Sequence, residues 1–509
     1  MGAQRRGRRR ALATGILLGL VAVASPGVDA AGASPTAPPP PAPRNGPPPE
    51  DILATDPDNV EAPTDVSIAD VGAAAACPPA AAGVHNYAPG GGKTVALTFD
   101  DGPGPSTEAI IRILQDHGVT ATFFNVGVNM AVRPGLVQAE HDLGYMLGNH
   151  TWDHQELPTL TAAQQASEMD QASAQQVSIV GSPPCVFRPP YGSYNSTTLS
   201  LAQARNMVTW NWSVDTEDWR SEGSSSSTWV NTIIQRAQAG GSLTHPVILM
   251  HNPARALPAT VAALPTIIRF YRDRGYTFVD LAGRVANRPV AGDWDGNGTT
   301  TVGVSRGSSW LLRNANSAGG ANAVFAYGTA TDRPVVGDWD GNGTTTVGIV
   351  RGSVWHLRNA NSGGAANVTV GYGAPTDRPV AGDWDGNGTT TLGIVRGNAW
   401  HLRNSNSAGA ANITFGYGAA SDRPIVGDWD GNGTTTVGIV RGRTWHLRNA
   451  NSGGAANITF GYGLPTDQPI VGDWDGNGTV TVGIVRGNTW HLRNANSAGP
   501  ADVIVTYAP

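Results

Sequence analysis

The sequence predicts two folded domains, an α/β domain over residues 84–286 and an all-β repeat domain over residues 287–509. In the first region, short apolar runs alternate with helix-like segments, which is the pattern of a mainly parallel sheet. In the second region, one motif recurs five times at a constant spacing of 45 residues. A 45-residue repeat of short strands has the size of a propeller blade, so we predict a five-bladed β-propeller.

The first 30 residues have the pattern of a signal peptide. Five arginines between Arg5 and Arg10 precede an apolar run, 11–24, and small residues permit cleavage after Ala24 or Ala30. The run is shorter than the ~20 residues of a membrane-spanning helix, although an uncleaved membrane anchor remains the alternative. We therefore expect a secreted protein, extracellular or associated with the cell wall, with no membrane attachment after cleavage.

Residues 31–83 are rich in Pro and Ala, with scattered acidic residues and few aromatic ones. Such a segment buries too little apolar surface to offset its ordering entropy, so we predict a disordered linker. It contains Cys77, and the chain has one other cysteine, Cys185. Because an exported protein meets an oxidising environment, we expect these two to form a disulfide.

Seven short runs predict the strands of the α/β domain. They are Thr94–Phe99, Thr122–Val126, Tyr145–Gly148, Val186–Arg188, Met207–Ser213, Val247–Met250 and Thr277–Val279. The clearest helices are Ser106–His117, closed by Gly118, and Val261–Arg274, closed by Gly275. This alternation favours an incomplete barrel with its active site at the carboxyl ends of the strands.

Each repeat of the second domain contains four short strands and one Asp-Trp-Asp-Gly-Asn-Gly segment. A tryptophan recurs in step with this segment, at Trp310, Trp355, Trp400, Trp445 and Trp490. A β-solenoid is the alternative to the propeller. The recurring Trp-His-Leu-Arg strand could line a sugar-binding face, but a repeated tryptophan is more often part of a blade core.

The charge composition argues against nucleic acid as a partner. Only 14% of the residues are charged and the net charge is −6, so the chain lacks the basic surface that nucleic-acid binding requires. A neutral partner such as a glycan remains compatible with this composition.

Polar side chains follow three of the predicted strands. Asp100 and Asp101 follow the first, His150 and His154 the third, and His251 the sixth. We expect the i, i+4 spacing of the histidine pair to place both on one face of a helical turn. Two histidines and one carboxylate make a three-ligand metal site with an open position for water, and a second carboxylate could act as base on that water. The alternatives are an Asp–Asp turn or helix cap and a histidine pair without metal.

The region from Lys93 to Leu281 resembles the NodB-homology polysaccharide deacetylases, carbohydrate esterase family 4. Five motifs carry the resemblance, in the family's order: Thr98-Phe99-Asp100-Asp101-Gly102-Pro103, His150-Thr151-Trp152-Asp153-His154, Arg188-Pro189-Pro190-Tyr191-Gly192, Asp215-Thr216-Glu217-Asp218-Trp219 and Leu249-Met250-His251. The resemblance implies a distorted (β/α) barrel and a divalent metal, Zn²⁺ or another such as Co²⁺, held by Asp101, His150 and His154. It also implies that Asp100 is the catalytic base and His251 the acid.

Further roles follow from the same resemblance. Arg188 would orient the base, Asp218 would orient the acid, and Trp219 would help to wall the sugar subsite. The backbone N–H of Tyr191 is expected to help to hold the tetrahedral oxyanion. The family often has Asp after the catalytic histidine, whereas here the residue is Asn252. We expect this difference to adjust the properties of the catalytic site and not to abolish its activity.

One competing motif, Gly303-Val304-Ser305-Arg306-Gly307, matches the nucleophile elbow of serine hydrolases. The equivalents of Ser305 in the other repeats are Val350, Val395, Val440 and Val485. Ser305 is therefore interpreted as a strand variant within a repeat and not as a nucleophile.

The repeated acidic loops resemble the calcium loops of FG-GAP and integrin-type propellers, with oxygen side chains at positions 1, 3 and 5. These residues are Asp293, Asp295, Asn297, Asp338, Asp340, Asn342, Asp383, Asp385, Asn387, Asp428, Asp430, Asn432, Asp473, Asp475 and Asn477. Those loops commonly have Asp at position 9, where this chain has Thr301, Thr346, Thr391, Thr436 and Thr481. Ca²⁺ sites and hydrogen-bonded turns both remain open.

The main functional hypothesis is a monomeric, exported, metal-dependent enzyme that removes N-acetyl groups from chitin, chito-oligosaccharides or peptidoglycan, with repeats that bind glycan or cell wall. The same site could remove O-acetyl groups from xylan. A third hypothesis is an adhesin whose α/β domain is inactive, which the intact motif set disfavours.

Overall fold

A curled sheet forms the centre of the α/β domain in the computed structural model, which describes residues 80–507 of the protein. Its strands are β1 (Val84–His85), β2 (Thr94–Gly102), β3 (Thr122–Asn125), β4 (Met146–Asn149), β5 (Val186–Phe187), β6 (Val208–Trp210), β7 (Val214–Asp215), β8 (Val247–His251) and β9 (Thr277–Phe278). The helices are α1 (Thr107–His117), α2 (Gly127–Val132), α3 (Pro134–Asp142), α4 (Ala162–Val180), α5 (Ser196–Ala204), α6 (Ser227–Ala239) and α7 (Pro258–Asp273).

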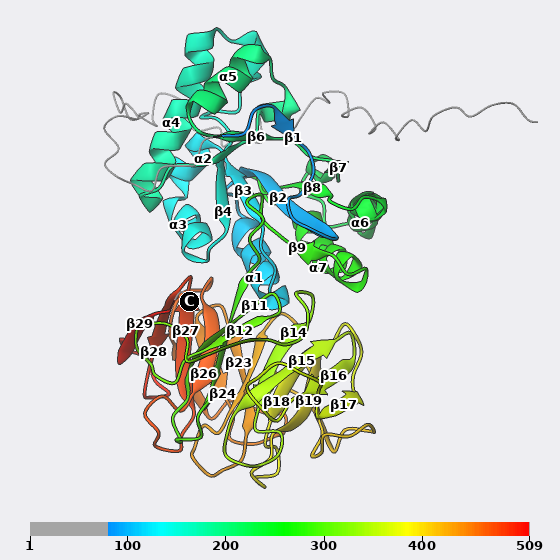
Figure 1. The fold of residues 1–509 in the computed structure, drawn as a ribbon, viewed down its shortest axis with the longest axis vertical. Helices are drawn as coiled ribbons and strands as arrows, with labels where there is room; N and C mark the ends of the chain where they lie inside the picture. The colour runs from blue at the N-terminus through cyan, green and yellow to red at the C-terminus, as the bar shows by residue number, and fades with distance from the viewer. Residues whose placement is uncertain (1–79, 508–509) are drawn as a thin grey trace, which may run out of the picture. The chain divides into compact units, whose positions relative to one another are not determined.

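The order along the sheet is β1-β6-β5-β4-β3-β2-β8-β7, with β9 paired to β2. Each of these pairs is parallel, as the alternation of strands and helices predicted. The helices surround the curled sheet (Figure 1). The prediction of a distorted, incomplete barrel is therefore confirmed.

β2 is the central strand of this domain and all nine of its residues are buried. Side chains such as Leu97 and Phe99 pack with Ile111 of α1 and Ile267 of α7 in the main apolar cluster. A parallel strand covered on both faces needs a continuous run of apolar and small residues, which explains the composition of Thr94–Phe99. The strand continues beyond the predicted end at Phe99, so Asp100 and Asp101 are strand residues at the edge of the core.

The two predicted helices are present with small shifts at their ends. α1 begins one residue later than expected and ends before Gly118, which adopts the left-handed conformation (φ 57°) that a C-terminal glycine provides. α7 begins three residues before the expected start because Pro258 occupies its first turn, where its missing N–H costs nothing.

The repeats form five four-stranded antiparallel sheets (Figure 1). Their strands are β10 (Asn287–Gly292), β11 (Thr301–Arg306), β12 (Ser309–Leu312) and β13 (Ala323–Ala326); β14 (Arg333–Gly337), β15 (Thr346–Arg351), β16 (Val354–Leu357) and β17 (Val368–Gly371); β18 (Arg378–Gly382), β19 (Thr391–Arg396), β20 (Ala399–Leu402) and β21 (Ile413–Gly416); β22 (Arg423–Gly427), β23 (Thr436–Arg441), β24 (Thr444–Leu447) and β25 (Ile458–Gly461); and β26 (Gln468–Gly472), β27 (Thr481–Arg486), β28 (Thr489–Leu492) and β29 (Val503–Thr506).

The five sheets close into a ring. The first strand of each blade contacts the first strand of the next, and β26 contacts β10. Thr345 of the second blade donates its backbone N–H to the carbonyl of Asp293 in the first blade (2.7 Å), and Thr300 makes the same bond to Asp473 of the last blade (2.7 Å). The predicted five-bladed propeller is confirmed, and the solenoid alternative is wrong because a solenoid does not close.

The repeated tryptophans belong to the blade cores. Trp355, Trp400 and Trp445 have no exposed surface, and the indole N–H of Trp400 donates to the carbonyl of Tyr417 (3.1 Å). They are therefore unavailable to stack on a sugar. Ser305 is buried in β11 and pairs in register with Trp310 of β12, as expected for a strand variant.

The acidic loops are built as hydrogen-bonded turns. In the third blade, Asp383 Oδ1 accepts the backbone N–H of Asn387 (3.1 Å) and Oδ2 that of Gly388 (2.7 Å). Gly388 has a φ of 86°, which a side chain would make unfavourable. The carboxylate at position 1 is thus engaged by backbone N–H groups, which favours the turn interpretation over a calcium loop.

Several predictions concern residues outside the described range. The signal peptide, most of the linker and Cys77 lie there, whereas Cys185 is described and is disulfide-bonded. Across residues 80–507, no helix has the length and apolar character needed to cross a membrane.

We predict that Asp383→Ala lowers the free energy of unfolding of the propeller by about 1–3 kcal/mol, because two backbone N–H groups lose a charged acceptor. Urea unfolding followed by tryptophan fluorescence measures this change. The control is Asp385→Ala, which removes an exposed carboxylate from the same loop. If the loops held calcium, both variants and a calcium chelator would lower stability; we expect the chelator and the control to have no effect.

Candidate metal centre

The predicted site residues converge at the carboxyl ends of neighbouring strands. Asp100 and Asp101 lie just before the last residue of β2, His150 follows β4, Arg188 follows β5, and His251 ends β8. Since the sheet order is β5-β4-β3-β2-β8 and the strands are parallel, these ends lie at one edge. Asp100 and His251 are direct partners in the register of β2 and β8.

Asp101 occupies an unusual backbone position. Its φ is 68°, in the left-handed region, and the pairing of β2 with β3 shifts register between Asp100 and Gly102. Such bulges redirect side chains next to functional sites. Asp101 is 2% exposed, and among the described residues neither of its carboxylate oxygens has a hydrogen-bond partner.

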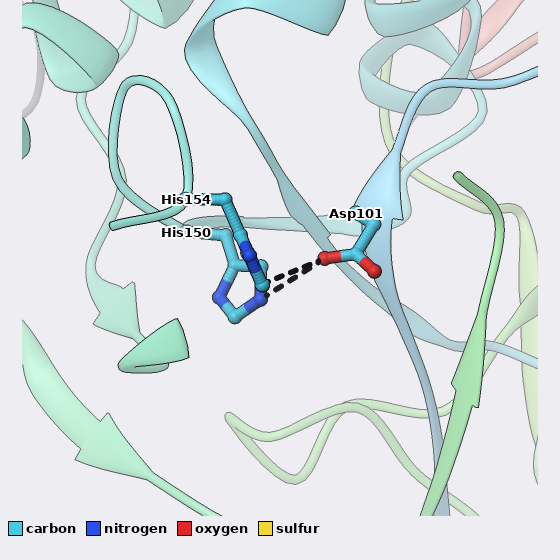
Figure 2. A group of neighbouring side chains, drawn as sticks. All are labelled: Asp101, His150 and His154. Carbon is cyan, nitrogen blue, oxygen red and sulfur yellow. Dashed lines mark ion pairs between the residues drawn. The ribbon is translucent and has the colours of Figure 1, made fainter. Parts of the chain in front are cut away.

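His150 and His154 come from a loop, so the prediction of a helical turn is wrong. Thr151 and His154 both have positive φ, 67° and 65°, and these two residues turn the chain so that the imidazoles meet. Their ring centroids are 5.0 Å apart. Figure 2 shows both rings directed at Asp101: His154 Nε2 lies 3.1 Å and His150 Nε2 3.4 Å from Asp101 Oδ1.

The orientation of His150 is set by a hydrogen bond on its other nitrogen. His150 Nδ1 lies 2.7 Å from the carbonyl oxygen of Arg188 and must donate to it. Nδ1 therefore carries a proton, and Nε2 is the ring nitrogen that faces Asp101. This arrangement, in which a carbonyl fixes the tautomer, is usual for histidines that bind metals.

The residues present fit a divalent metal. One ligand atom from each of Asp101, His150 and His154 lies within 4.8 Å of the others, and all three residues are buried. Burial alone would raise the pKa of Asp101, but the neighbouring histidines outweigh it and hold that pKa well below its usual range. A buried carboxylate without hydrogen-bond donors beside two imidazoles is the donor set of a catalytic zinc site, in which a fourth position stays open.

The second carboxylate, Asp100, is held by an arginine. Arg188 has no exposed surface, and its Nη1 donates to Asp100 Oδ1 (2.7 Å) and to Thr98 Oγ1 (2.9 Å). The guanidinium also lies over the ring of Phe124, 4.2 Å from its centroid. Asp100 Oδ2 lies 3.7 Å from His150 Nε2, so the carboxylate faces the metal ligands.

On the other side, His251 is paired with a buried carboxylate. Its Nδ1 lies 2.7 Å from Asp218 Oδ1, and its backbone N–H donates to Asp218 Oδ2 (2.9 Å). Thr260 Oγ1 donates to the same oxygen (2.7 Å). Burial alone would lower the pKa of His251, but Asp218, helped by Asp101 and Asp100, raises it to about 10. His251 is therefore an imidazolium at neutral pH.

Three further predicted residues lie around this centre. The ring of Tyr191 is 4.7 Å from that of His154, and Trp219 lies half-buried beside Asp218 in a short 3₁₀ helix. Asn252 is fully buried; its backbone N–H donates to the carbonyl of Asp100 (2.9 Å) and its side chain to Thr107 Oγ1 (3.0 Å). Asn252 thus helps to join β8, β2 and α1.

Sequence reasoning missed the residues that hold the histidine loop. Glu168 of α4 accepts the backbone N–H groups of Trp152 (2.9 Å) and Asp153 (3.2 Å) on one oxygen. Asn149 accepts the N–H of Thr151 (2.8 Å) and donates to the carbonyl of Met169 in α4 (2.8 Å). Asn149 could have been suspected from its place next to His150, but Glu168 has no local signal.

The chain is similar to known polysaccharide deacetylases. A family model described as polysaccharide deacetylase matches residues 87–210. A peptidoglycan-N-acetylglucosamine deacetylase of Bacillus cereus is 33% identical over 192 residues, which are 36% of this chain and 68% of that protein. PgdA, the corresponding deacetylase of Listeria monocytogenes, is 32% identical over 37% of this chain and 38% of its own. A bifunctional xylanase/deacetylase of Pseudobutyrivibrio xylanivorans is 32% identical over 37% of this chain and 30% of its own.

We predict that Asp101→Asn weakens divalent-metal binding at least about 100-fold, beyond the 10–100-fold typical of changes outside the ligand set. The reason is that the variant removes the ligand charge and keeps the side-chain volume. Isothermal titration of the metal-stripped protein with Zn²⁺ measures the affinity. Asp153→Asn removes a carboxylate from the same loop and is the matched control; equal affinities of the two variants would contradict the assigned ligand.

Glu168→Gln is expected to weaken the same affinity about 10-fold, because a neutral amide is a poorer acceptor for two backbone N–H groups. The measurement is again titration with Zn²⁺. Glu156→Gln, on the other side of the histidine loop, controls for the loss of a carboxylate. Unchanged affinity in the Glu168 variant would show that α4 does not hold the loop.

Proposed function

Because the chain belongs to the polysaccharide deacetylase family, we propose that it is an exported, metal-dependent hydrolase that removes N-acetyl groups from a GlcNAc-containing glycan, either peptidoglycan or chitin. One observation carries this proposal: a buried Asp–His–His set lies beside a carboxylate paired with arginine and an imidazolium paired with aspartate. Such a site holds a base and an acid at the same time.

Asp101, His150 and His154 would hold the metal, which supplies polarisation of the acetyl carbonyl and activation of water when bound. Asp100 accepts the proton of the attacking water. Its hydrogen bond from Arg188 directs one oxygen away, so the other oxygen faces the reacting atoms. Because Arg188 is itself fixed by Thr98 and by the carbonyl of Asn211 (3.0 Å), the base is held before substrate arrives.

His251 donates the second proton. Attack of water on the amide carbon gives a tetrahedral intermediate, and the C–N bond breaks as the nitrogen takes the proton from His251 Nε2, leaving acetate and the free amine. Nε2 carries that proton because Nδ1 is bonded to Asp218. No covalent bond between enzyme and substrate is needed.

The sugar would lie against Tyr191 and Trp219. Tyr191 adopts a φ of 61° and its ring lies 4.7 Å from that of His154, and its backbone N–H is our candidate donor to the oxyanion. Trp219 follows the residue that holds the acid, so a sugar stacked on it would lie close to His251.

The choice of glycan rests on the relatives. Two of them are named for peptidoglycan N-acetylglucosamine, which supports an N-acetyl substrate for this chain. The relative that combines a deacetylase with a xylanase supports the second candidate, O-acetyl xylan, because the same groups cleave esters. The complete set of catalytic side chains argues against an inactive domain in an adhesin. We propose that the propeller keeps the exported enzyme on its polymer.

Acetate release by the full-length protein tests the activity. We expect release from peptidoglycan or chitotetraose that exceeds release from acetylxylan, is abolished by a chelator and restored by Zn²⁺, and falls at least about 10³-fold in Asp100→Asn. The exposed-carboxylate variant Asp385→Asn is the control. Release that survives chelation would exclude the metal mechanism, and no release from any polymer would favour the adhesin.

The pH dependence tests the assigned acid. The pKa of His251 is raised to about 10, and the acid must be protonated, so activity should fall as the pH rises through that pKa. Asp218→Asn removes the main cause of the raised pKa and should move this alkaline limit down by roughly one to three pH units. Thr260→Val removes one hydrogen bond from Asp218 but keeps its charge, and should leave the limit in place. An unshifted limit in the Asp218 variant would rule out His251 as the acid.

A further inference from the structure

The propeller contains a cleft between consecutive blades. It has a volume of about 350 Å³ and lies between the edge of the second blade and a face of the third. Ser353 and the segment Gly371–Gly373 line one side, and Ile394, Arg396 and His401 line the other. This volume is at the lower end of small-molecule sites, which run from roughly 300 to 1,000 Å³.

The strand register explains why these side chains meet. Ile394 of β19 pairs with His401 of β20, and His401 pairs with Thr414 of β21, so the three side chains share one face. Tyr372 joins that face to the second blade by donating its hydroxyl to the carbonyl of His401 (3.1 Å). Gly373 lies against this face, with no side chain to fill the cleft.

The cleft is polar and its charges are balanced. Arg396 donates to both carboxylate oxygens of Asp377 from Nε and Nη2 (2.8 Å each), which leaves Nη1 outside the pair. At the corresponding position of the second blade, burial and the nearby Arg351 lower the pKa of the His356 imidazole. Because the guanidinium charge is balanced by a carboxylate, and the imidazole can form hydrogen bonds, the cleft favours a neutral ligand rich in hydroxyl groups over an anion. Tyr372 is only 8% exposed, so the cleft offers no aromatic face to a nucleobase.

The repeats themselves show that the imidazole is not needed for folding. The framework recurs in all five blades, and the tyrosine hydroxyl bonds the carbonyl of the next blade at His356, His401, His446, His491 and Leu311. In the first blade Leu311 replaces histidine, and Tyr507 still donates to its carbonyl (3.2 Å). Two residues before the histidine, the side chain varies freely: Val354, Ala399, Thr444 and Thr489. A half-buried histidine kept in four repeats beside such variation is better explained by a ligand than by packing.

We propose that the cleft containing His401, and the corresponding positions at His356, His446 and His491 in the other repeats, each bind one neutral sugar unit of the glycan. The imidazole and the guanidinium would contact hydroxyl groups, and the backbone of the glycine segment would contact the sugar from the other side. The inference rests on the proposed function, since the glycan is the polymer on which the α/β domain acts. Four weak sites on one ring can hold a polymer 10²- to 10⁴-fold more tightly than one site.

Two measurements on the full-length protein test this proposal. In the first, ¹H–¹³C spectra of the histidine rings are followed during titration with chitotetraose to about 10 mM, well above the Kd expected of weak single sites. We expect the Cε1–Hε1 signals of the four cleft histidines to shift, with assignments from the single His→Leu variants, and those of His141 and His245 to stay in place. No shift at the four clefts would overturn the proposal.

In the second, retention on insoluble peptidoglycan and chitin is compared between the protein and the variant His356→Leu/His401→Leu/His446→Leu/His491→Leu. Leucine is tolerated at this position in the first blade, so the variant should unfold at the same temperature. We expect retention to fall at least about 10-fold while acetate release from soluble chitotetraose is unchanged. Unchanged retention would overturn the proposal. If the histidine signals shift but no acetate is released, the proposed deacetylase activity is contradicted while the proposed sugar sites are supported.

Discussion

The parallel pairing of β2 with β3 on one side and β8 on the other is the constraint on which the catalytic arrangement depends. It places Asp100 directly opposite His251 and brings the end of β4 to the same edge through β3. The register is fixed by burial, since β2 has no exposed residue and a slip by one position would turn every apolar side chain to the wrong face. The bulge at Asp101 then separates two adjacent carboxylates into different roles.

Buried charges hold the rest of the site. Arg188 and Asp218 have no exposed surface, and each is paired with a group that faces the reacting atoms. Buried ion pairs seldom add stability, because desolvation offsets their attraction, but removing one partner is costly. The role of these two ion pairs is therefore to fix the position and protonation of Asp100 and His251. Asp101 is different, because its oxygens lack hydrogen-bond donors and its charge is balanced by a cation when one is bound.

In the propeller, five nearly identical sheets are joined by a repeated set of hydrogen bonds between blades. Each blade is tied to the next by a backbone hydrogen bond to the acidic loop, donated by a threonine at four junctions and by Val480 at the fifth, and by a tyrosine hydroxyl on a strand carbonyl. These ties use main-chain acceptors, so they recur even where side chains differ, as between Leu311 and His401. The half-buried histidine side chains on the blade faces, such as His401, are therefore not required for these ties.

The sequence by itself determined the two domains, the alternation of strands and helices, the number of repeats and the residues of the candidate centre. Periodicity and strand-end motifs are local signals, and packing reinforces them. Only the tertiary structure decided how His150 and His154 meet, because the left-handed backbone at Thr151 and His154 is imposed by anchors from α4 rather than by local preference. The same holds for Glu168, whose partners lie 15 and 16 residues away, and for the clefts, whose two walls come from different repeats. Contacts between distant segments leave no pattern in a single sequence, since nothing at either position marks its partner.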